Sequence, residues 1–142
     1  MPNTEKEKQP FMENEVKIID LSGASSMDEA LKVLEILNTR KAHGVKLLHV
    51  EDKTVIADYF VICSGNSNTQ VKSLSAEIEY KMGLCNLNPQ HIDGYSAGEW
   101  VVLDFGAVMV HIFTPSARDF YKLEKLWADA EEVDVSPYFI EE

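Results

Sequence analysis

The sequence has no apolar segment long enough to cross a membrane. No run without Asp, Glu, Lys or Arg is longer than the one from Tyr59 to Val71, whereas a membrane-spanning helix needs about 20 apolar residues. The first eight residues contain neither an apolar run nor an arginine-rich stretch, so neither a secretory signal nor a usual transit peptide is expected. At 142 residues the chain is expected to be one cytoplasmic domain with no membrane partner.

Cysteine and histidine are too few and too scattered to indicate a metal site. The two cysteines, Cys63 and Cys85, match neither a metal-ligand spacing nor a disulfide framework. Cys63 lies in an apolar run, where a reduced thiol usually packs as a small core residue. The four histidines, at positions 43, 49, 91 and 111, show no ligand spacing either. The sequence therefore predicts no metal and no cofactor.

Catalytic motifs are also scarce. No strand carries the Asp-x-Asp pair that a magnesium-dependent transferase would use. The triplet Asp104-Phe105-Gly106 matches a kinase motif, but the chain lacks the other kinase motifs, so the triplet indicates a β-turn. The loop Ser64-Gly65-Asn66-Ser67 could hold a phosphate on free backbone N–H groups, although it lacks the ending of a P-loop. The sequence predicts no catalytic residue, and a degenerate nucleotidyltransferase using residues 64–67 is the alternative.

Basic residues are in the minority. There are 13 Lys and Arg against 24 Asp and Glu, which gives a net charge of −11. Most of this excess lies near the two ends of the chain, and residues 128–142 contain acids but no base. A protein that binds nucleic acid through phosphates needs a clustered basic surface. We therefore expect little direct contact with nucleic acid, whereas a basic protein is a suitable partner; the acidic end can equally serve solubility.

Apolar spacing predicts the element order α-β-β-α-β-β-β-α. The first helix is expected to begin at a capping box of Ser26 and Glu29, and the second at Ser67. The third, capped by Thr114 with proline next, would carry one apolar stripe made of Phe120, Leu123, Trp127 and Ala130. The strands are expected at 45–50, 59–63, 91–95, 99–104 and 107–113.

This order predicts an α/β fold in which helices pack on a mixed sheet. The domain is expected to span residues 26–130. It would lie between a poorly ordered N-terminal tail, residues 1–25, and an acidic C-terminal tail, residues 131–142.

Side-chain alternation separates the two faces of strands 99–104 and 107–113. One face is aliphatic and is expected to be core: Val101, Leu103, Val108, Val110 and Ile112. The other face is mixed: Trp100, Val102, Asp104, Met109 and His111. Trp and Met are enriched in protein contacts, so the mixed face is either a contact surface or covered by a helix, with His111 as a hydrogen-bonded core histidine. The sequence leaves both interpretations open.

The outer face of the last helix extends this pattern. It carries Tyr121, Glu124, Lys125 and Ala128 opposite the apolar stripe. In a protein contact, aromatic side chains bury area while acids select a basic partner. Together with Trp100 and Asp104, the residues Tyr121 and Glu124 therefore indicate an amphipathic patch suited to a basic partner.

Three segments resemble the ribosomal silencing factors, also called the RsfS or Iojap-like family. The first is Asp58–Ser67, the second is Gly98–Gly106 followed by Val110–Phe113, and the third is Arg118–Trp127. The resemblance covers residues 27–130. It implies an α/β fold distantly similar to nucleotidyltransferases, without their catalytic residues.

The resemblance implies a binding role and no enzymatic activity. Such factors bind the large ribosomal subunit against its protein fourteen and block joining of the small subunit when nutrients are short, and homodimers also occur. Carried over by position, Trp100, Asp104, Tyr121 and Glu124 would make the contact. The two ends of the chain depart from the family pattern. The absence of a transit peptide favours a bacterial over an organellar factor.

Overall fold

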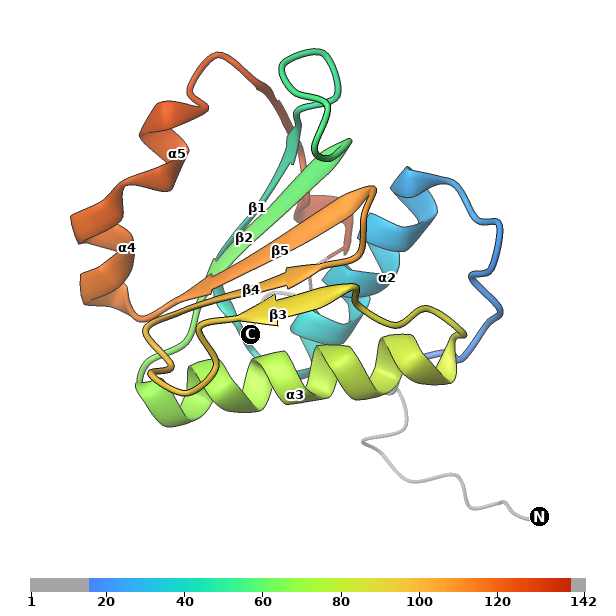
Figure 1. Cartoon of the computed structure of the whole chain (residues 1–142), viewed down its shortest axis with the longest axis horizontal. Coiled ribbons are helices and arrows are strands. Elements are labelled where there is room, and N and C mark those ends of the chain that lie inside the picture. Colours follow the sequence, from blue (N-terminus) through green and yellow to red (C-terminus); the bar gives the residue numbers. More distant parts are fainter. Residues whose placement is uncertain (1–15, 139–142) are drawn as a thin grey trace.

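The computed structural model describes residues 16–138 and shows one six-stranded mixed sheet with helices on both faces (Figure 1). The strands are β1 (His43–His49), β2 (Tyr59–Ser64), β3 (His91–Asp93), β4 (Trp100–Asp104), β5 (Val108–Phe113) and β6 (Glu131–Val133), in the spatial order β3-β4-β5-β2-β1-β6. Strands β2 and β5 pair in parallel, and the other neighbours are antiparallel. The predicted α/β class with a mixed sheet is confirmed.

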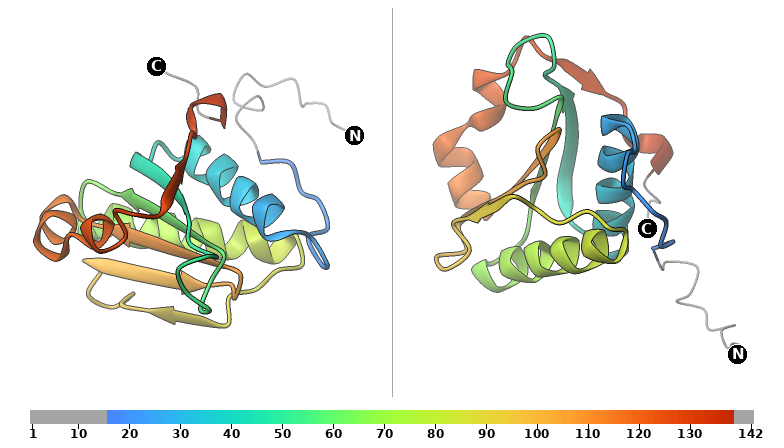
Figure 2. Two further views of the ribbon diagram at one scale, coloured as in Figure 1. Left: turned by 90° about the horizontal axis from the view of Figure 1, so that it is seen from above. Right: turned by 45° about the vertical axis from the view of Figure 1, so that its right-hand side comes forward.

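The helices are α2 (Ser26–Thr39), α3 (Asn68–Leu84), α4 (Pro115–Tyr121) and α5 (Leu123–Leu126), followed by a 3₁₀ turn, η2 (Ser136–Tyr138). Helices α2 and α3 pack on one face of the sheet, and α4 and α5 lie on the other (Figure 2). Relative to the predicted order, the structure adds the short helix α5 and the edge strand β6. Among the described residues, no helix is both long and apolar enough to cross a bilayer.

The main core lies between the sheet and the pair α2 and α3. The aliphatic face predicted from alternation is buried there, since five side chains are fully shielded from solvent: Val101, Leu103, Val108, Val110 and Ile112. Cys63 is buried in the same core, as expected, and this burial raises the pKa of its thiol to about 12. A thiol with so high a pKa stays protonated and inert at neutral pH.

Local capping residues explain where the helices begin. The Ser67 hydroxyl accepts a hydrogen bond from the Gln70 N–H at the start of α3, and Thr114 does the same for Ala117 at the start of α4. Both predicted caps are confirmed. For α2 the prediction is wrong by one residue, because the capping hydroxyl belongs to Ser25.

The capping box predicted around Ser26 is absent because Glu29 does not reach back to the helix start. Its side chain is buried, and its Oε1 has no hydrogen-bond partner among the described residues. Burial, and to a lesser degree the neighbouring charge of Asp58, raise the pKa of the Glu29 carboxyl.

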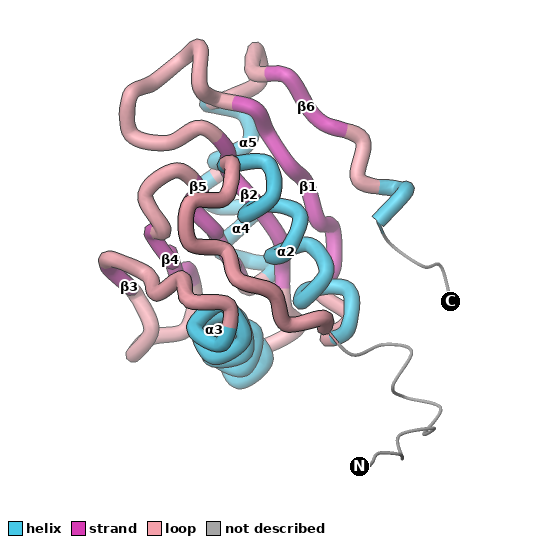
Figure 3. Tube along the Cα trace, turned by 90° about the vertical axis from the view of Figure 1, so that its right-hand side faces the viewer, coloured by secondary structure: helices cyan, strands magenta, loops and turns pink. Residues whose placement is uncertain are grey.

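The packed part of the chain extends beyond the expected boundaries at residues 26 and 130. Val16 and Leu21, which fall in the predicted N-terminal tail, are buried in the main core. At the other end, Glu131–Val133 forms β6 on the outer side of β1 (Figure 3), and Val133 packs against the core. Backbone pairing and apolar contacts therefore hold parts of both segments. The remaining tail residues, 1–15 and 139–142, lie outside the described residues.

Candidate partner-binding surface

The mixed face of β4 and β5 is covered in part by α4 and α5. A second, smaller core forms there around Phe60, Ile62, Phe113 and Leu123, with Trp100, Met109 and Trp127 packed at its margin. His111 is buried in this layer, only 5% exposed, and accepts a hydrogen bond from the Trp100 indole. Of the two interpretations left open by the sequence, the core histidine is confirmed, while Trp100 stays half-buried at the edge of the layer.

Trp100 and Tyr121, two of the predicted binding residues, lie side by side. Their ring centroids are 4.9 Å apart, although β4 carries one and α4 the other. Trp100 also stacks on Phe113 at 4.9 Å, and Phe120 meets the Tyr121 ring edge-on at 5.0 Å. Tyr121 is 48% exposed and Phe120 77% exposed. We call Trp100, Phe120 and Tyr121 the aromatic patch.

The exposure of Phe120 contradicts the apolar stripe predicted for the last helix. The chain leaves helical geometry at Lys122, whose φ of 52° and ψ of 48° are left-handed, so α4 and α5 are separate. After this break the helical periodicity restarts, so residues on either side no longer share one face. Leu123 is buried and Trp127 packs against the second core as predicted, but Phe120 points to solvent.

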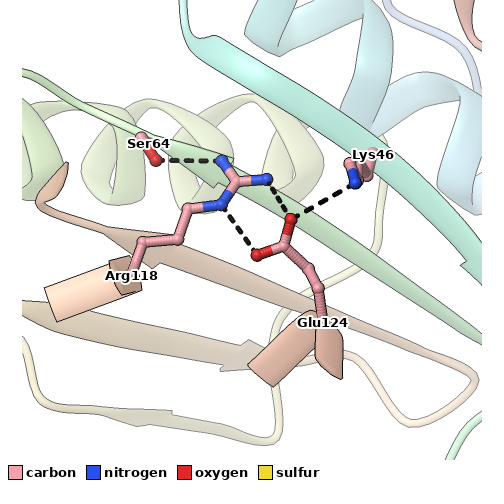
Figure 4. A network of polar contacts seen from close by, with 4 residues as sticks. All are labelled: Lys46, Ser64, Arg118 and Glu124. Carbon is pink, nitrogen blue, oxygen red and sulfur yellow. Dashed lines mark hydrogen bonds and ion pairs between the residues drawn. The ribbon is translucent and has the colours of Figure 1, made fainter. Parts of the chain in front are cut away.

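Glu124 is engaged inside the protein by a network of charged and polar groups (Figure 4). The Arg118 guanidinium donates to both Glu124 oxygens, from Nε at 3.0 Å and from Nη2 at 2.8 Å, while Nη1 donates to Ser64 Oγ at 2.9 Å. Lys46 Nζ lies 3.5 Å from Glu124 Oε2. The hydrogen bonds from Arg118 hold the pKa of the Glu124 carboxyl below its usual range. The network connects α5 to α4 and to strands β1 and β2.

Asp104 lies apart from the aromatic patch. Its Oδ1 accepts the Gly106 N–H at 2.8 Å, which stabilises the turn between β4 and β5. It lies four positions after Trp100 on the extended strand, roughly 13 Å along β4. The structure thus joins Trp100 and Tyr121, and places Asp104 and Glu124 in separate polar contacts.

The loop at residues 64–67 uses most of its polar groups within the fold. The Gly65 N–H donates to the Phe113 carbonyl, and the Asn66 N–H donates to Gln70 Oε1. The hydroxyl of Ser64 accepts from Arg118, and that of Ser67 caps α3. A phosphate at this loop would have to displace these bonds. Among residues 16–138, no cluster of His, Cys, Asp and Glu is arranged to hold a metal ion.

The sequence did not indicate the role of Arg118 or the exposure of Phe120. Arg118 and Glu124 are six residues apart, and on one continuous helix such residues do not face each other. They meet only because the chain breaks at Lys122. No periodicity in the sequence marks this break, since lysine is an ordinary helix former.

A family model described as "Ribosomal silencing factor during starvation" matches residues 23–142. The chain belongs to the ribosomal silencing factor family. The match includes residues 131–142, in agreement with the place of β6 in the sheet. The family is named for a regulatory role in translation. The three segments in which this sequence resembles the family form β2, β4–β5 and α4–α5 in the structure.

Curated relatives carry matching names. A ribosomal silencing factor RsfS from Bacillus subtilis is 36% identical over 96 residues, covering 68% of this chain and 81% of its own length. The mouse protein named "Mitochondrial assembly of ribosomal large subunit protein 1" is 32% identical over 98 residues, covering 67% of this chain and 43% of its own length.

Solved structures of bacterial proteins share the fold. A crystal structure of a protein from Chromobacterium violaceum matches with a TM-score of 0.72 and 29% identity, over 73% of this chain and 87% of that one. A crystal structure of a protein from Bacillus halodurans matches with a TM-score of 0.64 and 30% identity, over 76% of this chain and 95% of that one.

Proposed function

We propose that this protein is a non-enzymatic repressor of translation that acts in the cytoplasm. It binds the large ribosomal subunit against its protein fourteen and sterically blocks joining of the small subunit when nutrients are limiting. Membership of the silencing-factor family supports this role. The observation that carries the proposal is the aromatic patch, where β4 and α4 bring Trp100 and Tyr121 into contact at the surface.

The aromatic patch has the composition of a protein-binding site. Aromatic side chains supply large contact area at low cost in conformational entropy, and Trp and Tyr are enriched among residues that dominate binding energy. Asp104 and Glu124 are proposed to lie toward the rim, where charge affects the rate and orientation of approach more than final affinity. The net charge of −11 would attract a basic ribosomal protein. A homodimer remains a prediction from the family resemblance.

The alternative, a degenerate nucleotidyltransferase using residues 64–67, has less support. The N–H groups of Gly65 and Asn66 already donate within the fold, and Ser67 caps α3. A nucleotide would therefore have to compete with existing hydrogen bonds. The likeness to nucleotidyltransferases stays a prediction, and binding of a nucleoside triphosphate in the presence of magnesium would favour this alternative.

Co-sedimentation with separated ribosomal subunits tests the proposal. Two exposed tyrosines provide a test variant and a matched control variant. Tyr121→Ala removes part of the aromatic patch, whereas Tyr80→Ala removes a tyrosine that is 60% exposed on α3, away from the patch. Loss of a central aromatic typically costs about 2 kcal/mol or more. We expect Tyr121→Ala to weaken binding to the large subunit by roughly thirtyfold, and Tyr80→Ala to leave it unchanged.

The same preparations show whether bound protein blocks subunit joining. The wild-type chain should reduce formation of joined ribosomes from purified subunits, and Tyr121→Ala should not. Co-sedimentation with the small subunit alone, or equal binding by the Tyr121→Ala and Tyr80→Ala variants, would contradict the proposed surface.

A further inference from the structure

His111 lies beside Trp100 on the neighbouring strand, on the face of the sheet that carries the second core. Trp100 Nε1 donates to His111 Nδ1 at 3.2 Å. On its other side the imidazole packs against Phe60, whose ring centroid is 4.8 Å away. The ring is buried, so the histidine cannot itself contact a partner.

The hydrogen bond determines the protonation of His111. An indole N–H can only donate, so Nδ1 must be unprotonated and the remaining proton must be on Nε2. Burial lowers the pKa of His111 to about 4, which keeps the ring neutral over the physiological range. Nε2 has no hydrogen-bond partner among the described residues. A buried unpaired donor destabilises the fold, so the stability of this layer alone does not account for a histidine here.

For Trp100 the hydrogen bond has two consequences. It fixes the rotation of the indole, which also packs against Phe113 and Tyr121 at 4.9 Å. It also directs the indole's one polar group inward, so the half-buried ring presents only carbon to the surface. Without His111 as its acceptor, the N–H would need another partner, and rotation of the ring toward water would provide one.

We infer that His111 is a positioning residue for partner binding: it holds Trp100 in the orientation that the aromatic patch presents, with the N–H turned away from the partner. This inference rests on the proposed function of the patch. It further specifies the partner, which must meet Trp100 with an apolar or cationic group and not with a hydrogen-bond acceptor.

Two substitutions at position 111 separate positioning from packing. His111→Asn places an amide oxygen close to the position of Nδ1 and retains an acceptor, whereas His111→Leu fills the site without one. Both are made in a Trp127→Phe background, which leaves Trp100 as the single tryptophan, since the chain has two. We expect the fluorescence emission of Trp100 to shift in the Leu variant and to stay near that of the background protein in the Asn variant.

Binding to the large subunit is measured on the same proteins. We expect His111→Leu to weaken it about five- to tenfold, the equivalent of one net hydrogen bond, and His111→Asn to restore most of the loss. In a Trp100→Phe background, which has no indole N–H at position 100, His111→Leu should cause no further loss. If the Leu variant does not fold, His111→Phe, which also fills the site without an acceptor, replaces it in both backgrounds.

Each result has a separate meaning. Failure of the wild-type chain to bind the large subunit would overturn the proposed function and this inference with it. Normal wild-type binding that His111→Leu leaves intact would overturn the positioning role alone. An equal loss from His111→Leu with and without the Trp100→Phe substitution would also overturn it, because the effect would then not act through the indole N–H.

Discussion

The residues of the network around Arg118 constrain one another's positions. Gly44, which lies against the Arg118 guanidinium, is an example. A Cβ atom at Gly44 would lie 2.9 Å from Arg118 Nη1. Arg118 cannot easily move away, because Glu124 and Ser64 hold all three of its guanidinium nitrogens. Glycine is thus needed at position 44 both for its φ of +57° and for space.

This close approach gives a test with an internal control. Gly44→Ala and Gly23→Ala both place a Cβ at positive φ, which costs about 1–2 kcal/mol, but the Cβ added at Gly23 would have no neighbouring atom within 4 Å. We expect Gly44→Ala to lower the free energy of unfolding by about 1 kcal/mol more than Gly23→Ala, because it also disturbs Arg118. Urea denaturation of both variants measures the difference. Equal losses of unfolding free energy in the two variants would show that Arg118 can move aside without destabilising the protein.

At the scale of elements, a histidine connects the edge strand to the rest of the sheet. His49 pairs with Glu131 across β1 and β6. Its Nδ1 lies 3.3 Å from Glu131 Oε1, its Nε2 lies 3.1 Å from Glu51 Oε1, and its ring stacks on Tyr59. Hydrogen bonds to Glu51 and then to Glu131 raise the pKa of His49 above its ordinary value of 6.5.

The attachment of β6 should therefore weaken as the pH rises. Because the folded state favours protonated His49, the contribution to stability is complete below pH 6.5 and is lost as the pH passes the higher pKa of the folded protein. An NMR titration of the His49 ring protons should give a pKa above 6.5, and Glu131→Gln should lower it. Glu132→Gln is the control. Glu132 is next to Glu131 in the sequence, but its side chain lies on the opposite face of β6. A titration that Glu131→Gln leaves unchanged would refute this connection.

For the whole molecule, the two layers of helices differ in how firmly they are held. Helices α2 and α3 pack over the larger core, in which almost every side chain is shielded. Helices α4 and α5 are short, interrupted at Lys122 and packed over the smaller core. Segments with fewer buried contacts open locally more often than the protein unfolds globally.

We expect amide hydrogens in α4 and α5 to exchange at least about tenfold faster than those of β2 and β5, a difference of about 1.4 kcal/mol in opening free energy. Hydrogen-exchange mass spectrometry on the free protein measures this. Addition of large ribosomal subunits should slow exchange in α4 and leave α3 unaffected. Uniform protection across both layers would mean that α4 and α5 open only when the whole protein unfolds.

The sequence by itself determined the features that depend on near neighbours. Ser67 and Thr114 cap their helices because a hydroxyl needs only an N–H three residues later. The aliphatic face of β4 and β5 was predicted correctly because strand alternation fixes which side chains lie together. The mixed face, which carries Trp100, was correctly separated from it for the same reason.

Only the tertiary structure decided the break at Lys122, the place of β6, and the partners of Trp100 and Glu124. Local propensity favours a continuous helix through Lys122, and a left-handed lysine costs about 1–2 kcal/mol. Interactions across the break offset this cost: Leu123 is buried, and the Arg118 guanidinium is bound by Glu124 and Ser64. Those partners lie on separate elements, and interactions between distant segments leave no periodic signal in the sequence.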